Sequence, residues 1–393
     1  MLLTKAPRCG RRSTGWIIAM VAAPFWSGQF CYLAAVQEYI PSLKGSHSKI
    51  VPMLSGATIT PNDEPLFRKY YLNYGFARWR VPENINQLPK FRGEFRTDLG
   101  LAKAADVHNR LTAMALEFFP DIAKGSDPPT VRVNAALMVG ELNVKEWAGN
   151  VPSKPLPAAI DPLLAMVNAK EQLDAVKAAA LVGLVRHAET GIEDDEARQQ
   201  VSNAMVKLVD VPLRPGPAAE GQAWIKSQGI EILGMLGGTG ENNAVPELLG
   251  KFLGDADMPL SVRRAAAHAL GRLNYLTAGV HASTLAVAVG KFAVTACRHA
   301  KTELEEGKTV SVPAVKTYLL AAKTALSGFD PQHAGIAGAA KGTAADETFV
   351  ATVLEKVEKL LETIEAPDGG VANAIQKTEA AAGELGAFVE KSS

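Results

Sequence analysis

The stretch Ser261-Val-Arg-Arg-Ala-Ala-Ala-His-Ala-Leu-Gly-Arg-Leu273 decides the fold, because variants of it recur three times upstream. Each copy has an apolar residue followed at once by Arg or Lys. A small residue stands four positions after the apolar one, and another apolar residue stands eight positions after it. The four copies begin at Val131 and Arg132, Val176 and Lys177, Ile225 and Lys226, and Val262 and Arg263.

This spacing is that of one buried face of an α-helix, so each copy predicts an inward-facing helix. Glycine stands at the ninth offset in three copies, as Gly140, Gly234 and Gly271, and the second copy carries Gly183 two places earlier. An interior glycine costs a helix about 1 kcal/mol relative to alanine. We therefore expect a neighbouring helix to pack very close at these positions.

A second, proline-led helix precedes two of the copies, at Asp161-Pro-Leu-Leu and at Val245-Pro-Glu-Leu-Leu. Helix, short loop and Val-Lys/Arg-x-Ala-Ala together resemble the HEAT repeat, including the HEAT-like repeats first associated with phycobilisome lyases. The resemblance covers residues 127–275 and implies an all-α fold, an α-α superhelix of the HEAT-like solenoid type.

The resemblance also implies a polar ladder between neighbouring repeats, made by an aspartate ahead of each basic residue. Asp127, Asp174 and Asp257 are the candidates, and the third copy has no equivalent. Two proline-rich inserts, 151–157 and 211–217, separate the copies and are expected in loops.

The N-terminal segment 1–36 combines a basic start with an apolar run from Trp16 to Trp26 that continues weakly to Val36. This pattern is typical of a cleaved export signal, and the uncharged run is also long enough for an uncleaved membrane anchor at 16–36. We therefore expect an exported protein, either periplasmic or extracellular, or one anchored at its N-terminus.

Composition and periodicity divide the remaining chain into six segments. In chain order they are a linker at 37–64, an N-terminal helical cap at 65–126, the HEAT-like repeats at 127–275, degenerate helical repeats at 276–326, a flexible linker at 327–345 and a C-terminal helical hairpin at 346–393. Lys plus Arg and Asp plus Glu both total 41, so no global charge attraction toward nucleic acid or a membrane is indicated.

Interleaved arginine and aromatic residues in the cap define the candidate binding residues Arg78, Trp79, Arg80 and Arg92. Such residues can stack bases or hold acidic groups, although no nucleic-acid motif accompanies them. The simpler interpretation is that large aromatics cover the exposed first repeat. On that interpretation, loss of the Arg80 side chain is nearly neutral for stability.

No catalytic, metal or cofactor motif stands out in the sequence. The seven histidines show no pair at metal-ligand spacing on one helix, and His268 lies inside a repeat helix, where packing is the usual role. Gly237-Gly-Thr-Gly240 follows a helix and lacks the end of a phosphate loop, so we interpret it as a helix stop. Cys297 has His299 only two positions away, which places the two on different helix faces.

The sequence therefore predicts a non-catalytic HEAT-like scaffold, without a cofactor, that binds a protein or another macromolecule in or outside the cell envelope. A lyase-like or cofactor-handling HEAT-like protein is the first alternative. Nucleic-acid binding through the basic, aromatic cap is the second.

Overall fold

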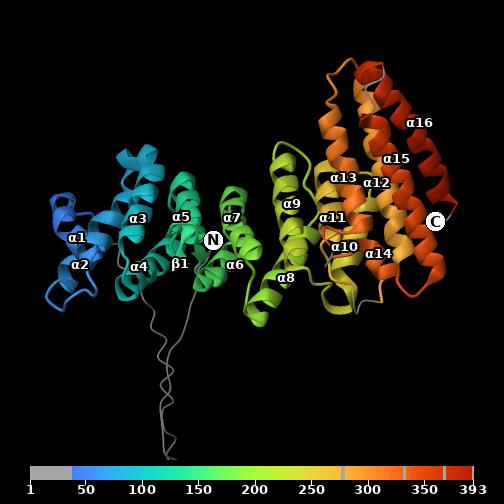
Figure 1. Cartoon of the computed structure of the whole chain (residues 1–393). Helices are drawn as coiled ribbons and strands as arrows, with labels where there is room; N and C mark the ends of the chain where they lie inside the picture. The colour runs from blue at the N-terminus through green and yellow to red at the C-terminus, as the bar shows by residue number, and fades with distance from the viewer. Residues whose placement is uncertain (1–37, 276–278, 331–332, 366–368, 392–393) are drawn as a thin grey trace, which may run out of the picture. The chain divides into compact units, whose positions relative to one another are not determined.

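The protein was analysed as a computed structural model that describes residues 38–275, 279–330, 333–365 and 369–391 (Figure 1). Sixteen α-helices and one pair of short strands are present in these residues, together with short 3₁₀ and π turns. The predicted all-α class is confirmed. The described residues belong to one compact unit that begins at Glu38.

The signal or anchor predicted for residues 1–36 lies outside the described residues. Within the described ranges, no helix has both the length and the apolar character that crossing a bilayer requires.

The N-terminal part is built from short helical elements that lead into two longer helices. In chain order they are η1 (Pro41–Ser46), α1 (His47–Leu54), α2 (Glu64–Tyr70), the π-helical turn η2 (Tyr71–Phe76), η3 (Ala77–Arg80), η4 (Pro82–Gln87), α3 (Leu88–Leu101) and α4 (Ala105–Lys124).

The repeat region continues with α5 (Pro129–Glu141), strands β1 (Asn143–Lys145) and β2 (Lys154–Pro155), η5 (Pro157–Ala159), α6 (Ile160–Asn168), α7 (Asp174–Thr190), α8 (Asp195–Asp210), α9 (Ala219–Leu236), η6 (Glu241–Asn243), α10 (Ala244–Gly254) and α11 (Leu260–Leu270). The strands pair in antiparallel fashion within the insert between α5 and α6. The C-terminal part contains α12 (Ala282–Glu305), α13 (Val312–Ser327), α14 (Gly335–Ala340), α15 (Ala344–Glu365) and α16 (Gly370–Glu390).

Helix contacts follow a regular order along the chain. Each even-numbered helix from α4 to α12 packs on the odd-numbered helix that follows it. The odd-numbered helices also pack on one another in succession, from α5 through α7, α9, α11 and α13 to α15. The four apolar residues that begin the recurring signature lie on these odd helices and are buried; they are Val131, Val176, Ile225 and Val262.

Glycine permits three of these helix contacts to be made backbone to backbone. A Cβ on Gly140 of α5 would lie 2.7 Å from the Cα of Gly183 in α7, and one on Gly234 of α9 would lie 2.8 Å from the Cα of Ala269 in α11. Gly271, which follows α11, faces the backbone of Thr324 in α13. Gly271 therefore follows its helix, Gly140 and Gly234 lie in the last turn of theirs, and Gly183 is in a helix interior.

Two segments expected to be linkers contribute to the core. Residues 37–64 contain η1 and α1, and Ile50 and Leu54 of α1 are fully buried. Residues 327–345 contain α14, where Ile336 is fully buried. Both segments are rich in glycine, proline or small residues, and a few well-placed apolar side chains suffice to dock so short a helix.

The aspartate ladder expected from the resemblance is absent from the described residues. Asp127 accepts two hydrogen bonds from Arg80, and Asp174 pairs with Arg214 at 3.1 Å. The backbone N–H of Asp257 donates to Asp255. Three of the basic residues have other partners: Arg132 donates to the Ala123 carbonyl, Lys226 to the Val211 carbonyl at 2.9 Å, and Arg263 to the Thr295 hydroxyl at 3.4 Å.

Candidate functional site

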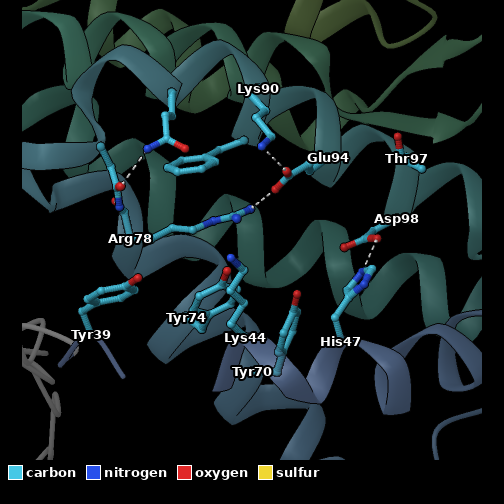
Figure 2. A pocket seen from close by; sticks show the side chains of 13 residues that line it. Tyr39, Lys44, His47, Tyr70, Tyr74, Arg78, Lys90, Glu94, Thr97 and Asp98 are labelled. Atoms are coloured by element: carbon cyan, nitrogen blue, oxygen red, sulfur yellow. Dashed lines mark hydrogen bonds and ion pairs between the residues drawn. The ribbon is translucent and has the colours of Figure 1, made fainter. Parts of the chain in front are cut away.

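A cavity of about 540 Å³ opens in the N-terminal part of the compact unit (Figure 2). Its walls come from three stretches of chain, namely residues 39–47, the turn from α2 into η2, and the segment from η4 to α3. The lining combines aromatic rings with side chains of both charges. We call it the tyrosine pocket.

Buried aromatic residues form the floor of the tyrosine pocket. Tyr70 and Tyr74 are 5% and 7% exposed, and their ring centroids lie 5.5 Å apart. They stand four positions apart where α2 passes into the π-helical turn η2. Tyr39 extends the floor, because its ring stacks on Tyr74 with centroids 6.1 Å apart. π-helical turns of this kind are frequent at functional sites.

A buried carboxylate, Asp98 of α3, closes one end of the pocket. The Tyr71 hydroxyl donates to its Oδ2 at 2.9 Å, and His47 Nε2 lies 3.4 Å from its Oδ1. Burial raises the pKa of Asp98 above its ordinary value, while the hydrogen bond from Tyr71 and the neighbouring His47 act in the opposite direction. Asp98 is thus held by two partners inside the protein.

Arg78 crosses the upper part of the pocket and is fixed on every side. Its Nη2 pairs with Glu94 at 2.7 Å, and its Nε donates to the Gly75 carbonyl at 3.1 Å. The guanidinium carbon lies 3.9 Å from the centroid of the Phe91 ring, a cation–π contact. Lys90 stands 3.9 Å from the other oxygen of Glu94. The guanidinium is therefore positioned before any ligand arrives.

Three phenol hydroxyls point into the space beside the Arg78–Glu94 pair (Figure 2). They belong to Tyr39, Tyr70 and Tyr74, and none of them has a hydrogen-bond partner among the described residues. Burial, followed by the charge of Asp98, raises the pKa of Tyr70 well above its ordinary value. Its hydroxyl therefore remains a hydrogen-bond donor at any physiological pH.

The candidate binding residues taken from the sequence occupy different environments. Arg78 lines the tyrosine pocket, whereas Trp79 is 1% exposed and packs against Phe119 with ring centroids 4.6 Å apart. Arg80 donates two hydrogen bonds to Asp127, at 3.0 and 2.9 Å. Arg92 lies 3.2 Å from Glu141 and also donates to Asn134.

The four residues are thus not brought together into one surface, and Trp79 has no exposed ring face on which a base could stack. The nearby aromatic residues pack on one another instead. Phe76 of η2 contacts Phe95 of α3 and both Phe118 and Phe119 of α4.

Two of the basic residues of the recurring signature are buried in the helix stack, and Nε and Nη1 of one of them, Arg263, have no partner among the described residues. Arg263 is 2% exposed, and burial lowers its pKa below the ordinary value. Lys226 is 3% exposed and donates to two carbonyls, that of Val209 in the last turn of α8 and that of Val211 just after it. Lys177 lines a second cavity, of about 590 Å³, together with Lys226 and the insert residues 211–214.

Other reactive groups lie outside the tyrosine pocket. Cys297 is buried, and desolvation raises the pKa of its thiol to about 12. His268 pairs with Glu231 at 3.0 Å. His187 lines a third cavity, of about 370 Å³, and its Nε2 is buried without a partner among the described residues. No group of three or more His, Cys, Asp or Glu residues in the described ranges is placed to hold a metal ion.

Sequence reasoning missed most of the tyrosine pocket. Phe91, Glu94 and Asp98 are spaced to share one face of α3, and this signal was available from the sequence. Tyr39 and His47 fall in the segment interpreted as a linker, so nothing in the pattern connected them with α3.

Comparison with models of protein families, with curated proteins and with solved structures gives no match to this chain.

Proposed function

We propose that this chain is a non-catalytic binding protein, in which a HEAT-like stack of helix pairs carries the tyrosine pocket. The succession of packed odd-numbered helices supports the stack, because each helix pair then needs contacts only with its neighbours. The glycine contacts support it further, since the close spacing recurs between α5 and α7 and between α9 and α11.

The observation that carries the binding function is the set of three unpartnered phenol hydroxyls. These hydroxyls are not among the fully buried side-chain atoms and face the open cavity, and a pocket that gathers several such donors without internal partners is suited to a polar ligand. The rigid Arg78–Glu94 pair and the buried rings add a fixed frame, which lowers the entropic cost of binding.

The lyase-like alternative has one supporting contact, the His47–Asp98 pair. A carboxylate can orient a histidine for proton transfer. The 3.4 Å distance joins Asp98 to Nε2, and the nucleophile that such a pair would activate has no counterpart among the described contacts of His47. The arrangement therefore fits a histidine that closes the pocket wall better than one that performs catalysis.

The test is capture of the native occupant by the full chain. Tagged protein is recovered from cell-envelope material and studied by native mass spectrometry, alongside a Tyr70→Phe/Tyr74→Phe variant that keeps both rings and removes both hydroxyls. Tyr318→Phe, on α13, is the matched control. We expect a bound species that wild type and Tyr318→Phe retain and the double variant loses. Equal retention by all three proteins would refute a binding role for the pocket.

A further inference from the structure

We propose that the tyrosine pocket recognises a carboxylate group, carried either by a free small acid or by the acidic group of a protein partner. The inference deepens the proposed function and depends on it, since it concerns the occupant of the same pocket.

Several hydrogen-bond donors of the lining remain available, and the one charged group among them is a cation. Lys44 is exposed and has no partner among the described residues, so its ammonium adds to the three phenol hydroxyls. The two carboxylates are already engaged, because Glu94 receives Arg78 and Lys90 while Asp98 receives Tyr71 and His47, and the acceptors left on Gln87 and Thr97 are neutral. A ligand that matches these donors must supply acceptor oxygens.

The charge balance favours a single negative charge on the ligand. Lys44, Arg78 and Lys90 contribute three positive charges to the lining, and Glu94 and Asp98 contribute two negative ones. These five groups leave one positive charge uncompensated. A carboxylate neutralises it, whereas a phosphate dianion would bring a second charge close to Glu94.

The aromatic floor favours a ligand whose remaining part, beyond the carboxylate, is flat or apolar. Tyr39 and Tyr74 stack nearly in parallel, with an interplanar angle of 19°, and both rings line the cavity. The volume of about 540 Å³ lies in the range of small-ligand pockets, or of one anchored side chain or chain end. A carboxylate next to a ring satisfies both the donors and the floor.

The experiment compares acids with their neutral amides on the full chain, by isothermal titration or ligand-detected NMR. Benzoate and benzamide represent a free small acid, N-acetylphenylalanine and its amide represent a chain-end carboxylate, and inorganic phosphate represents a second oxyanion. We expect each acid to bind about tenfold or more tightly than its amide, the effect of one charge-assisted contact. The acid that binds more tightly shows whether the pocket prefers a free small acid or the carboxylate of a protein partner.

Two variants tie the effect to this pocket. Lys44→Gln should weaken acid binding about tenfold. Lys49→Gln, an equally exposed change on α1 outside the pocket lining, should leave it unchanged. Circular-dichroism melting of both variants checks that the fold is preserved.

The alternative results separate this inference from the proposed function. Equal affinity for acid and amide removes the carboxylate preference and leaves the pocket as a binding site for another ligand. Tighter binding of phosphate overturns the charge argument. If no probe binds at millimolar concentration the carboxylate inference fails, and the capture experiment with the tyrosine variants decides the proposed function separately.

Discussion

Gly140 of α5 and Gly183 of α7 face each other so closely that a Cβ on Gly140 would lie 2.7 Å from the Cα of Gly183. No side chain separates the two helices at this point. Gly183 is in the interior of α7, where alanine is intrinsically preferred, and Gly140 lies in the last turn of α5. The close approach is the physical reason for glycine at both positions.

Gly183→Ala should therefore destabilise the protein, although alanine is the better helix former. The added methyl meets Gly140 and the Leu163 side chain, and we expect a loss of about 1 to 3 kcal/mol in the free energy of unfolding. Gly93→Ala on α3 is the matched control, because a Cβ there meets nothing within 4 Å. That change should stabilise the protein by about 0.5 to 1 kcal/mol. Urea unfolding measures both, and a stabilised Gly183→Ala would contradict the close contact.

Gly271→Val tests a different contact, at the end of α11. Its side chain would meet the backbone of Thr324 in α13, and backbone cannot move aside as a flexible side chain can. We expect a loss of about 3 kcal/mol or more, seen as a lower midpoint in thermal or urea unfolding. A variant as stable as wild type would show that α11 and α13 do not approach as described.

Arg80→Ala should cost more stability than the nearly neutral change that the sequence predicts. Arg80 and Asp127 form a bidentate pair between η3 and the residues just before α5, and the Asp127 side chain is 15% exposed. Because Arg80 remains about one third exposed, we expect a modest loss of about 1 kcal/mol. A double-mutant cycle with Asp127→Ala isolates the coupling between the two residues. A coupling energy near zero would restore the original prediction.

His187 should make stability depend on pH in the mildly acidic range. Burial, with a smaller contribution from Arg186, lowers its pKa from 6.5 to about 4. The unfolded chain therefore binds more protons between these two values, and stability falls as pH falls from 6.5 toward 4. The free energy of unfolding is therefore higher above pH 6.5 than below pH 4, and His187 accounts for about 3 kcal/mol of this difference at most.

Urea unfolding at pH 7.5 and pH 4.5 measures this dependence. His187→Leu should lose much less stability than wild type between the two values, while His299→Gln, a change of a half-exposed histidine, should behave as wild type does. The same pH dependence in His187→Leu and wild type would assign the effect to other groups.

Periodicity predicted the long helices well because their buried faces are regular. The four helices predicted from the recurring signature at Val131, Val176, Ile225 and Val262 are α5, α7, α9 and α11. Helix α8 was missed because it lacks the recurring signature, although Asp194 caps it and Val201 and Met205 mark its buried face. The cap and the apolar spacing are local features of the sequence that indicate a helix without reference to the repeats.

The tyrosine pocket was beyond prediction for a different reason. The face of α3 that carries Glu94 and Asp98 follows from helix geometry. Which segment lies opposite that face depends on how α1 docks, and α1 is a short helix of eight residues that contains a proline. Composition alone marked this segment as a linker, so the partner side chains could not be assigned.

All residues that line the tyrosine pocket fall between Tyr39 and Asp98, so the site is built from one contiguous stretch at one edge of the compact unit. Edges open more readily than interiors, because they have neighbours on one side only. A ligand that contacts Tyr39, His47 and Arg78 together would link three segments of this edge and oppose its local opening. Occupancy should slow amide hydrogen exchange in α1 and η2 and leave α10 unchanged, and uniform slowing along the chain would argue against such local closure.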